Sequence, residues 1–157
     1  MIQRIQSVFL FFVAVSMVLM LFFPLWQKVD PSSSENVVMD SFYLTYEKSE
    51  GIVTTENTFY IAIVAVLIAL VALISIFQFK NRLRQIKLGA LISFLILGIM
   101  ILSVYFVMQG EKLILPEQRG QYLWAFYLPL VALVFNFLSN RFIRKDEMLV
   151  RSADRIR

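Results

Sequence analysis

Residues 58–87 read TFYIAIVAVLIALVALISIFQFKNRLRQIK, and this stretch decides the fold. No charged residue lies between Glu56 and Lys80, which leaves 23 residues, or roughly 34 Å of α-helix at ~1.5 Å per residue. That length slightly exceeds the ~30 Å hydrocarbon core of a bilayer, so we expect a membrane span over residues 58–79. Four cations follow within residues 80–87, and loops rich in Lys and Arg stay on the cytoplasmic side of a membrane.

The rest of the chain has the same character. Of its 157 residues, 59% are hydrophobic and 17% are charged, and the apolar residues are concentrated in four blocks. We therefore predict an all-α integral membrane protein, a four-transmembrane-helix bundle with a single membrane domain. The spans are expected at about residues 5–27, 58–79, 88–110 and 120–140, with an outer loop at 28–57, a basic turn at 80–87 and a basic tail at 141–157.

Residues 5–27 also resemble the front of a signal peptide. Their apolar run is longer than the roughly 7–15 residues of a signal-peptide core, and it ends in Phe22-Phe23-Pro24-Leu25-Trp26 rather than in a small-residue cleavage site. We therefore expect a retained first span. Trp26 and the two phenylalanines are expected at the outer membrane–water interface, where amphipathic rings settle.

The loop at 28–57 is the only sizeable polar region, and it is acidic. Val37–Tyr46 is rich in β-branched and aromatic residues, Lys48–Gly51 supplies turn chemistry, and Ile52–Thr55 is again β-branched. This pattern predicts a small extracytoplasmic β-hairpin between helices one and two. The carboxylates of the loop lack EF-hand spacing, so a solvated outer face is favoured over a calcium site.

The charges are sorted between the two sides of the predicted bundle. Eleven of the 15 cations fall at the N-terminus, in the turn 80–87 and in the tail, whereas eight of the 11 acids fall on the other side. This asymmetry predicts that both termini are cytoplasmic. The cations expected at anionic lipid headgroups on that face are Lys80, Arg82, Arg84, Lys87, Arg141, Arg144, Lys145, Arg151, Arg155 and Arg157. The tail could form a short interfacial helix or touch an acidic partner, but lipid is favoured and nucleic acid is not expected.

Small and polar residues recur at helical spacing inside the spans. Small residues let helix backbones approach closely in lipid, where no hydrophobic force drives association. Two interpretations are open for this candidate helix-packing or partner face: the interior of the bundle, or a surface that docks another membrane protein. Asn136 is expected to hydrogen-bond across helices, because an unpartnered amide in hydrocarbon costs several kcal/mol, and Pro129 is expected to kink the fourth span. The face comprises Ala62, Ala65, Ala69, Ala72, Gly89, Ser93, Ala125, Pro129, Ala132, Asn136, Ser139 and Asn140.

The sequence lacks the side chains that most membrane chemistry uses. No Asp, Glu, Lys or Arg lies within the four predicted spans, and the chain has no Cys and no His. Intramembrane charges mark ion paths and proton relays, while Cys and His serve thiol chemistry, haem and zinc. We therefore expect no enzymatic activity, no catalytic residue, no cofactor and no metal site.

Three segments carry a resemblance to a known family. Residues 1–7 read MIQRIQS, residues 23–25 read FPL, and residues 144–157 read RKDEMLVRSADRIR. They resemble a family of small four-span bacterial membrane proteins known only as a domain of unknown function. The resemblance covers the whole chain and implies a bacterial inner-membrane location, but no activity, ligand or site residue.

Two functions are consistent with these features. The first is a non-enzymatic accessory or structural subunit of a larger bacterial inner-membrane assembly, with a membrane-protein partner of unknown identity. The alternative is a small homo-oligomeric carrier or channel for a neutral or apolar solute. The two differ in what co-purifies with the protein, which is a defined larger complex in the first case and a lone oligomer in the second.

Overall fold

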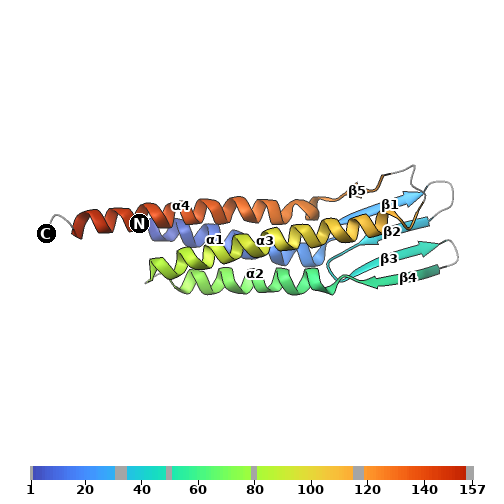
Figure 1. The fold of residues 1–157 in the computed structure, drawn as a ribbon, viewed down its shortest axis with the longest axis horizontal. Helices are drawn as coiled ribbons and strands as arrows, with labels where there is room; N and C mark the ends of the chain where they lie inside the picture. The colour runs from blue at the N-terminus through green and yellow to red at the C-terminus, as the bar shows by residue number, and fades with distance from the viewer. Residues whose placement is uncertain (1, 31–34, 49–50, 79–80, 115–118, 155–157) are drawn as a thin grey trace.

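The computed structural model describes residues 2–30, 35–48, 51–78, 81–114 and 119–154. Its four α-helices lie side by side, with a β-sheet at one end of the bundle and both chain ends at the other (Figure 1). The elements in chain order are α1 (Ile2–Phe22), β1 (Trp26–Asp30), β2 (Glu35–Met39), β3 (Tyr43–Lys48), β4 (Gly51–Asn57), α2 (Phe59–Phe77), α3 (Arg82–Glu111), β5 (Gln121–Tyr122), the 3₁₀ helix η1 (Trp124–Tyr127) and α4 (Leu128–Asp154).

The four long helices match the four uncharged blocks of the sequence. Segments within Ile5–Phe22, Phe59–Phe77, Arg82–Glu111 and Trp124–Leu149 are each long and apolar enough to cross a membrane. Most of their large outward-facing side chains are Leu, Ile, Val and Phe, as lipid contact requires. These helices indicate a multi-pass membrane protein.

The prediction of an all-α fold with one small β-hairpin is wrong. The extramembrane part is a five-stranded antiparallel sheet in the order β4-β3-β2-β1-β5. Strands β1–β4 lie between α1 and α2, and β5 comes from the connection between α3 and α4. The connection between β3 and β4 falls within the predicted turn at Lys48–Gly51, whereas β1 and β5 were not predicted at all.

The first helix ends earlier than expected, because the chain enters the sheet. α1 stops at Phe22, and Trp26 and Gln27 belong to β1. Trp26 does not sit at the lipid interface but is fully buried. A Cβ at Gly110 would lie 2.8 Å from the Trp26 ring and one at Gly120 would overlap the indole, so these two glycines make room for it.

Helix α3 supports the buried face of the sheet. Its 30 residues span about 45 Å, roughly 15 Å more than a bilayer core. The extra length at the sheet end places Gly110 against both Trp26 of β1 and Leu44 of β3. At the other end, Arg82, Arg84 and Lys87 lie in the first turns of α3 and not in a separate basic loop.

Helix α4 is longer than the predicted fourth span. Gly120–Leu123 precede it, and Pro129 is its second residue, so the missing N–H of the proline costs no helical hydrogen bond and the expected internal kink does not arise. The helix continues through Asn140 to Asp154. The described part of the tail therefore prolongs α4 and does not form a separate interfacial helix.

Candidate functional site

An ion pair with a buried lysine joins the sheet to the helices. Lys28 on β1 is only 2% exposed. Its Nζ donates to the backbone oxygens of Glu111, at 3.1 Å, and Ile114, at 3.3 Å, and lies 3.4 Å from Oε2 of Glu111. The other carboxylate oxygen of Glu111 accepts from the backbone N–H of Gly120 at 2.9 Å. A cation at a helix C-terminus is favourable, because the last carbonyls carry partial negative charge.

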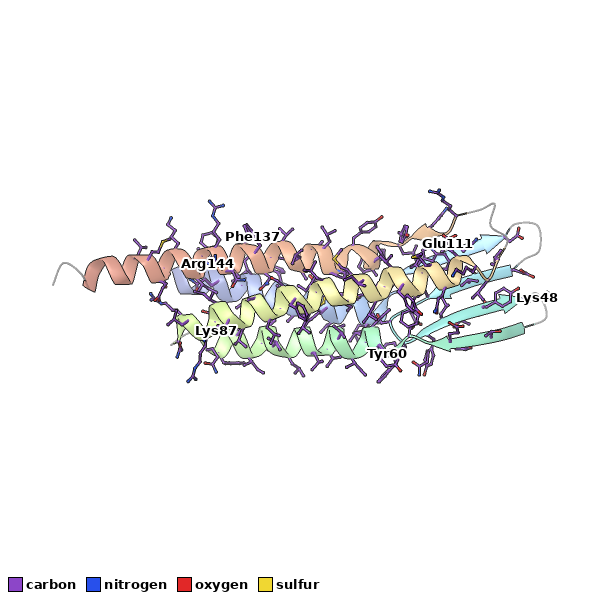
Figure 2. All side chains as sticks on the ribbon, viewed as in Figure 1. Lys48, Tyr60, Lys87, Glu111, Phe137 and Arg144 are labelled. Atoms are coloured by element: carbon purple, nitrogen blue, oxygen red, sulfur yellow. The ribbon has the colours of Figure 1, made fainter. Side chains whose placement is uncertain are left out.

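This pair ties together three segments that are distant in the sequence. Lys28 comes from β1, Glu111 ends α3, and Gly120 leads into β5 (Figure 2 shows Glu111 where α3 meets the sheet). The ammonium has three acceptors and the carboxylate has donors on both oxygens. Both charged groups thus bond within the protein and hold the sheet against α3. We call the contact between Lys28 and Glu111 the clamp. Sequence reasoning missed it, because both residues were counted as charges of outer loops.

A second polar contact lies between α3 and α4. Asn136 donates through Nδ2 to the backbone oxygen of Gly89 and to Oγ of Ser93, both at 2.8 Å. The expected cross-helix hydrogen bond of Asn136 is thus present, and its partner belongs to the same chain. A Cβ at Gly89 would overlap the carboxamide of Asn140, so the glycine allows the close approach of the two helices. On the other side of α4, Ser139 Oγ donates to the backbone oxygen of Gln6 on α1 at 3.3 Å.

The candidate packing face lies inside the bundle of this one chain. Ten of its twelve residues are buried, and Ser93 and Asn140 are half-buried. The buried members are Ala62, Ala65, Ala69 and Ala72 of α2, Gly89 of α3, Ala125 of η1, and Pro129, Ala132, Asn136 and Ser139 of α4. The geometry therefore favours the interior interpretation over the docking interpretation for these residues.

The predicted membrane-surface cations divide into two kinds. Arg82 is partly buried and bonded to Asp146 of α4: Nη1 donates to the backbone oxygen at 2.9 Å, and Nη2 lies 3.0 Å from Oδ2 as an ion pair. It is thus a helix-to-helix tie. Those that the structure leaves exposed are Arg84, Lys87, Arg141, Arg144 and Lys145. Lys80, Arg155 and Arg157 lie outside the described residues, and Arg151 is described only as part of the α4 backbone.

No metal centre is seen in the part of the chain that the structure describes: it contains no group of three or more His, Cys, Asp or Glu side chains that could hold an ion.

Residues 2–156 match the family model described as Domain of unknown function (DUF4293). The chain belongs to the DUF4293 family. This confirms the resemblance to a family of unknown function. No protein of curated function matches the sequence.

Two surfaces of this DUF4293 member remain open after the interior contacts are assigned. The first is a groove of about 940 Å³ between α3 and α4, near the end that carries both termini. Figure 2 labels two of its residues, Phe137 and Arg144, with Arg144 closer to that end. The groove is lined by Ile86, Ala90, Ser93, Phe137, Asn140, Arg141, Arg144, Lys145 and Met148.

The second surface is the outer part of the sheet. β4 forms one edge of the sheet and pairs with β3 alone, and its side chains from Thr54 to Asn57 are all exposed. Tyr43 lies next to β4 on β3 and is exposed. On the same strand, the pKa of Tyr46 is raised above its ordinary value, first by its hydrogen bond to Glu35 and then by desolvation and the charge of Glu35. The edge of the sheet thus presents the outward backbone N–H and C=O groups of β4, with aromatic and polar side chains beside them.

Proposed function

We propose that this protein is a non-enzymatic accessory or structural subunit of a larger bacterial inner-membrane assembly. Its termini are placed in the cytoplasm and its sheet outside the membrane on the periplasmic side. The partner meets the protein at the β4 edge of the sheet, where an extended segment of the partner adds a strand. The observation that carries this proposal is the position of β4 at the edge of the sheet, with the side chains from Thr54 to Asn57 exposed.

A free edge strand needs an explanation, because its unpaired N–H and C=O groups attract other strands. Natural proteins blunt such edges with short strands, inward charges, bulges or proline. β4 has seven residues and contains no proline, and after the register shift between Ile52 and Thr54 its pairing with β3 runs regularly to Asn57. The opposite edge strand, β5, has only two residues. Strand addition to an exposed sheet edge is a common mode of protein recognition. β4 is therefore the edge better suited to a partner.

The packing of the bundle also points to the sheet as the place of contact. The small and polar residues of the candidate packing face are engaged within the chain, as Asn136 shows by donating to Gly89 and Ser93. The clamp between Lys28 and Glu111 holds the sheet on the end of α3, so the edge is presented in a fixed position. A rigidly held edge loses little entropy when a partner binds.

Proline substitution tests the proposed edge. Successive residues of a strand direct their N–H groups to opposite sides. Of Thr54→Pro and Thr55→Pro, one therefore removes an N–H that points away from the sheet (the outward variant), and the other removes an N–H that bonds to β3 (the inward variant). The outward variant should keep the thermal stability of the wild type and yet lose the proteins that co-purify with it in native nanodiscs. The inward variant serves as the control and should lower stability. If the outward variant still purifies with the same larger complex, the β4 edge is not the contact with the partner. If the wild type purifies only as a homo-oligomer, the carrier or channel alternative is favoured.

The proposed orientation has its own test. Reporters fused after the last residue and inserted within the connection at 79–80 should read cytoplasmic, and those within 31–34 and 115–118 should read periplasmic. The support is the excess of cations at one end of the bundle, where both termini and the α2–α3 connection lie (Figure 1). A periplasmic reading at the C-terminus would contradict an even number of crossings.

A further inference from the structure

We infer that the groove between α3 and α4 is a binding site for one anionic phospholipid of the leaflet at the basic end. Its phosphate lies against the three cations of the α4 wall, and an acyl chain runs past Phe137 toward the bilayer centre. The inference goes beyond the proposed function and does not depend on it, because it needs no protein partner.

The groove changes from apolar to basic along the bundle. Its α4 residues fall on one stripe of the helix, at positions 137, 140 and 141, 144 and 145, and 148. Arg141 directly follows the uncharged run that ends at Asn140, so the cations lie where hydrocarbon gives way to headgroups. Phe137 lies one turn deeper and is 65% exposed, so its ring is available to an acyl chain.

The α3 wall gives the groove its depth. Ala90 is exposed and small, and Ile86 lies one turn closer to the basic end, so a lipid chain finds an apolar and recessed surface. Asn140 and Ser93 supply the polar groups of the wall. Asn140 is packed against Gly89, and Ser93 accepts from Asn136, so contacts that join the two helices also shape the site.

Arg141, Arg144 and Lys145 are exposed. They take no part in the ion pairs that join Lys28 to Glu111, Lys48 to Glu35 and Arg82 to Asp146 in the described part of the chain. Three cations on one face, at a membrane surface, attract an anion strongly. A free phosphate would meet the cations but leave the apolar wall uncovered, and the volume of about 940 Å³ is that of a site for a larger amphipathic ligand. An anionic phospholipid satisfies both halves.

Matched charge variants separate a site from a general attraction. Arg141→Gln with Arg144→Gln removes two cations from the groove, and Arg84→Gln with Lys87→Gln removes two exposed cations from the same end of the bundle but outside the groove. The protein is taken from nanodiscs containing equal phosphatidylglycerol and phosphatidylcholine, and bound lipid is measured by native mass spectrometry. The wild type should retain one phosphatidylglycerol. Since each cation at an anionic surface is worth about five-fold in affinity, the groove variant should bind it about 30-fold more weakly, while the control keeps wild-type binding.

A steric pair tests the apolar half without changing the charge. Ala90→Trp fills the groove and should also abolish phosphatidylglycerol retention, whereas Leu97→Trp, two turns along the exposed face of α3 and outside the groove, should not. Unfolding temperatures without added lipid show whether each variant is folded, and if Ala90→Trp is not, the charge pair carries the test. If both charge variants lose bound phosphatidylglycerol equally, the lipid is attracted by the basic surface in general, and the proposed site is wrong. If inorganic phosphate raises the unfolding temperature as much as phosphatidylglycerol does, the site takes a small anion and the lipid assignment is wrong.

Discussion

Replacement of Lys28 by Met removes the ammonium at the sheet–helix clamp and keeps most of the packing of the side chain. Among the described residues, Lys28 is the only donor to Oε2 of Glu111, and it also donates to the backbone oxygens of Glu111 and Ile114. The substitution removes all three contacts. A hydrogen bond to a charged group is worth about 1.5–3 kcal/mol, and the removal of one partner of a buried ion pair costs about 3–5 kcal/mol. The side chain of Glu111 is 33% exposed and keeps its bond to Gly120, so water can replace part of the lost contact. We expect a loss of about 2–4 kcal/mol.

The same substitution at Lys48 is the matched control. Lys48 forms an ion pair with Glu35 at 3.7 Å on the same sheet, but its side chain is 51% exposed. Exposed pairs contribute about 0–1 kcal/mol, so Lys48→Met should change the free energy of unfolding by no more than that. The comparison removes any general effect of Lys→Met on the charge or hydrophobicity of the sheet.

The clamp can be followed by fluorescence because Trp26 lies two residues away on the same buried face of β1. The chain has two tryptophans, so the measurement is made in a Trp124→Phe background. In Lys28→Met the emission of Trp26 should shift to the red at lower denaturant than in the parent, as the sheet leaves α3 and the indole meets water. If Lys28→Met unfolds together with Lys48→Met, or Trp26 stays buried to the same denaturant concentration as in the parent, the ammonium does not hold the sheet and our reasoning is refuted.

Three further predictions follow from the interior and the sheet. Ala132→Phe adds bulk at a fully buried position of α4 and should cost roughly 1–3 kcal/mol of stability, with or without a partner, as measured by thermal unfolding in detergent. Asn136→Leu should change stability by less than about 1 kcal/mol in the same assay, because two hydrogen bonds worth about 0.6 kcal/mol each are lost but the unpartnered buried Oδ1 is removed as well. The raised pKa of Tyr46 should fall toward 10 in Glu35→Gln, as measured by tyrosinate absorbance. Because the pKa is raised in the folded state, the hydrogen bond between Tyr46 and Glu35 stabilises the fold below pH 10, and this stabilisation is lost as the pH rises through the folded-state pKa.

The helices were predictable because a membrane span depends only on one continuous run of neighbouring residues. A long run without charge must be helical in hydrocarbon, where each backbone group needs an internal partner. The predicted span at residues 58–79 thus agrees with α2, Phe59–Phe77, to within two residues. The connection between β3 and β4 was also visible, since a lysine, a serine, an acid and a glycine follow one another at 48–51.

The remaining strands were hidden for physical reasons. β1 carries Lys28 and Asp30 on its buried face, so its alternation does not look like the alternation of apolar and polar residues that marks a strand. β5 has two residues, and it exists because Trp26 and Gln27 of β1 pair with Tyr122 and Gln121, which lie 96 and 94 positions later in the chain. The partners of Asn136 are likewise fixed by which helices are neighbours. The spacing of small residues predicted that the face would pack, but it contained nothing to identify Gly89 and Ser93 as its contacts.

The structure separates charges that are paired within the protein from the remaining charges, which we propose set its orientation in the membrane. Lys28 with Glu111, and Arg82 with Asp146, are charges of opposite sign that neutralise each other within the protein. When each pair is set aside, the end with both termini still has ten cations and the sheet end has three. Since orientation follows the excess of Lys and Arg near the ends of the spans, it should survive the loss of either ion pair. We therefore expect fold and orientation to be separable: Lys28→Met should weaken the attachment of the sheet to α3 and leave the reporters on the same sides of the membrane.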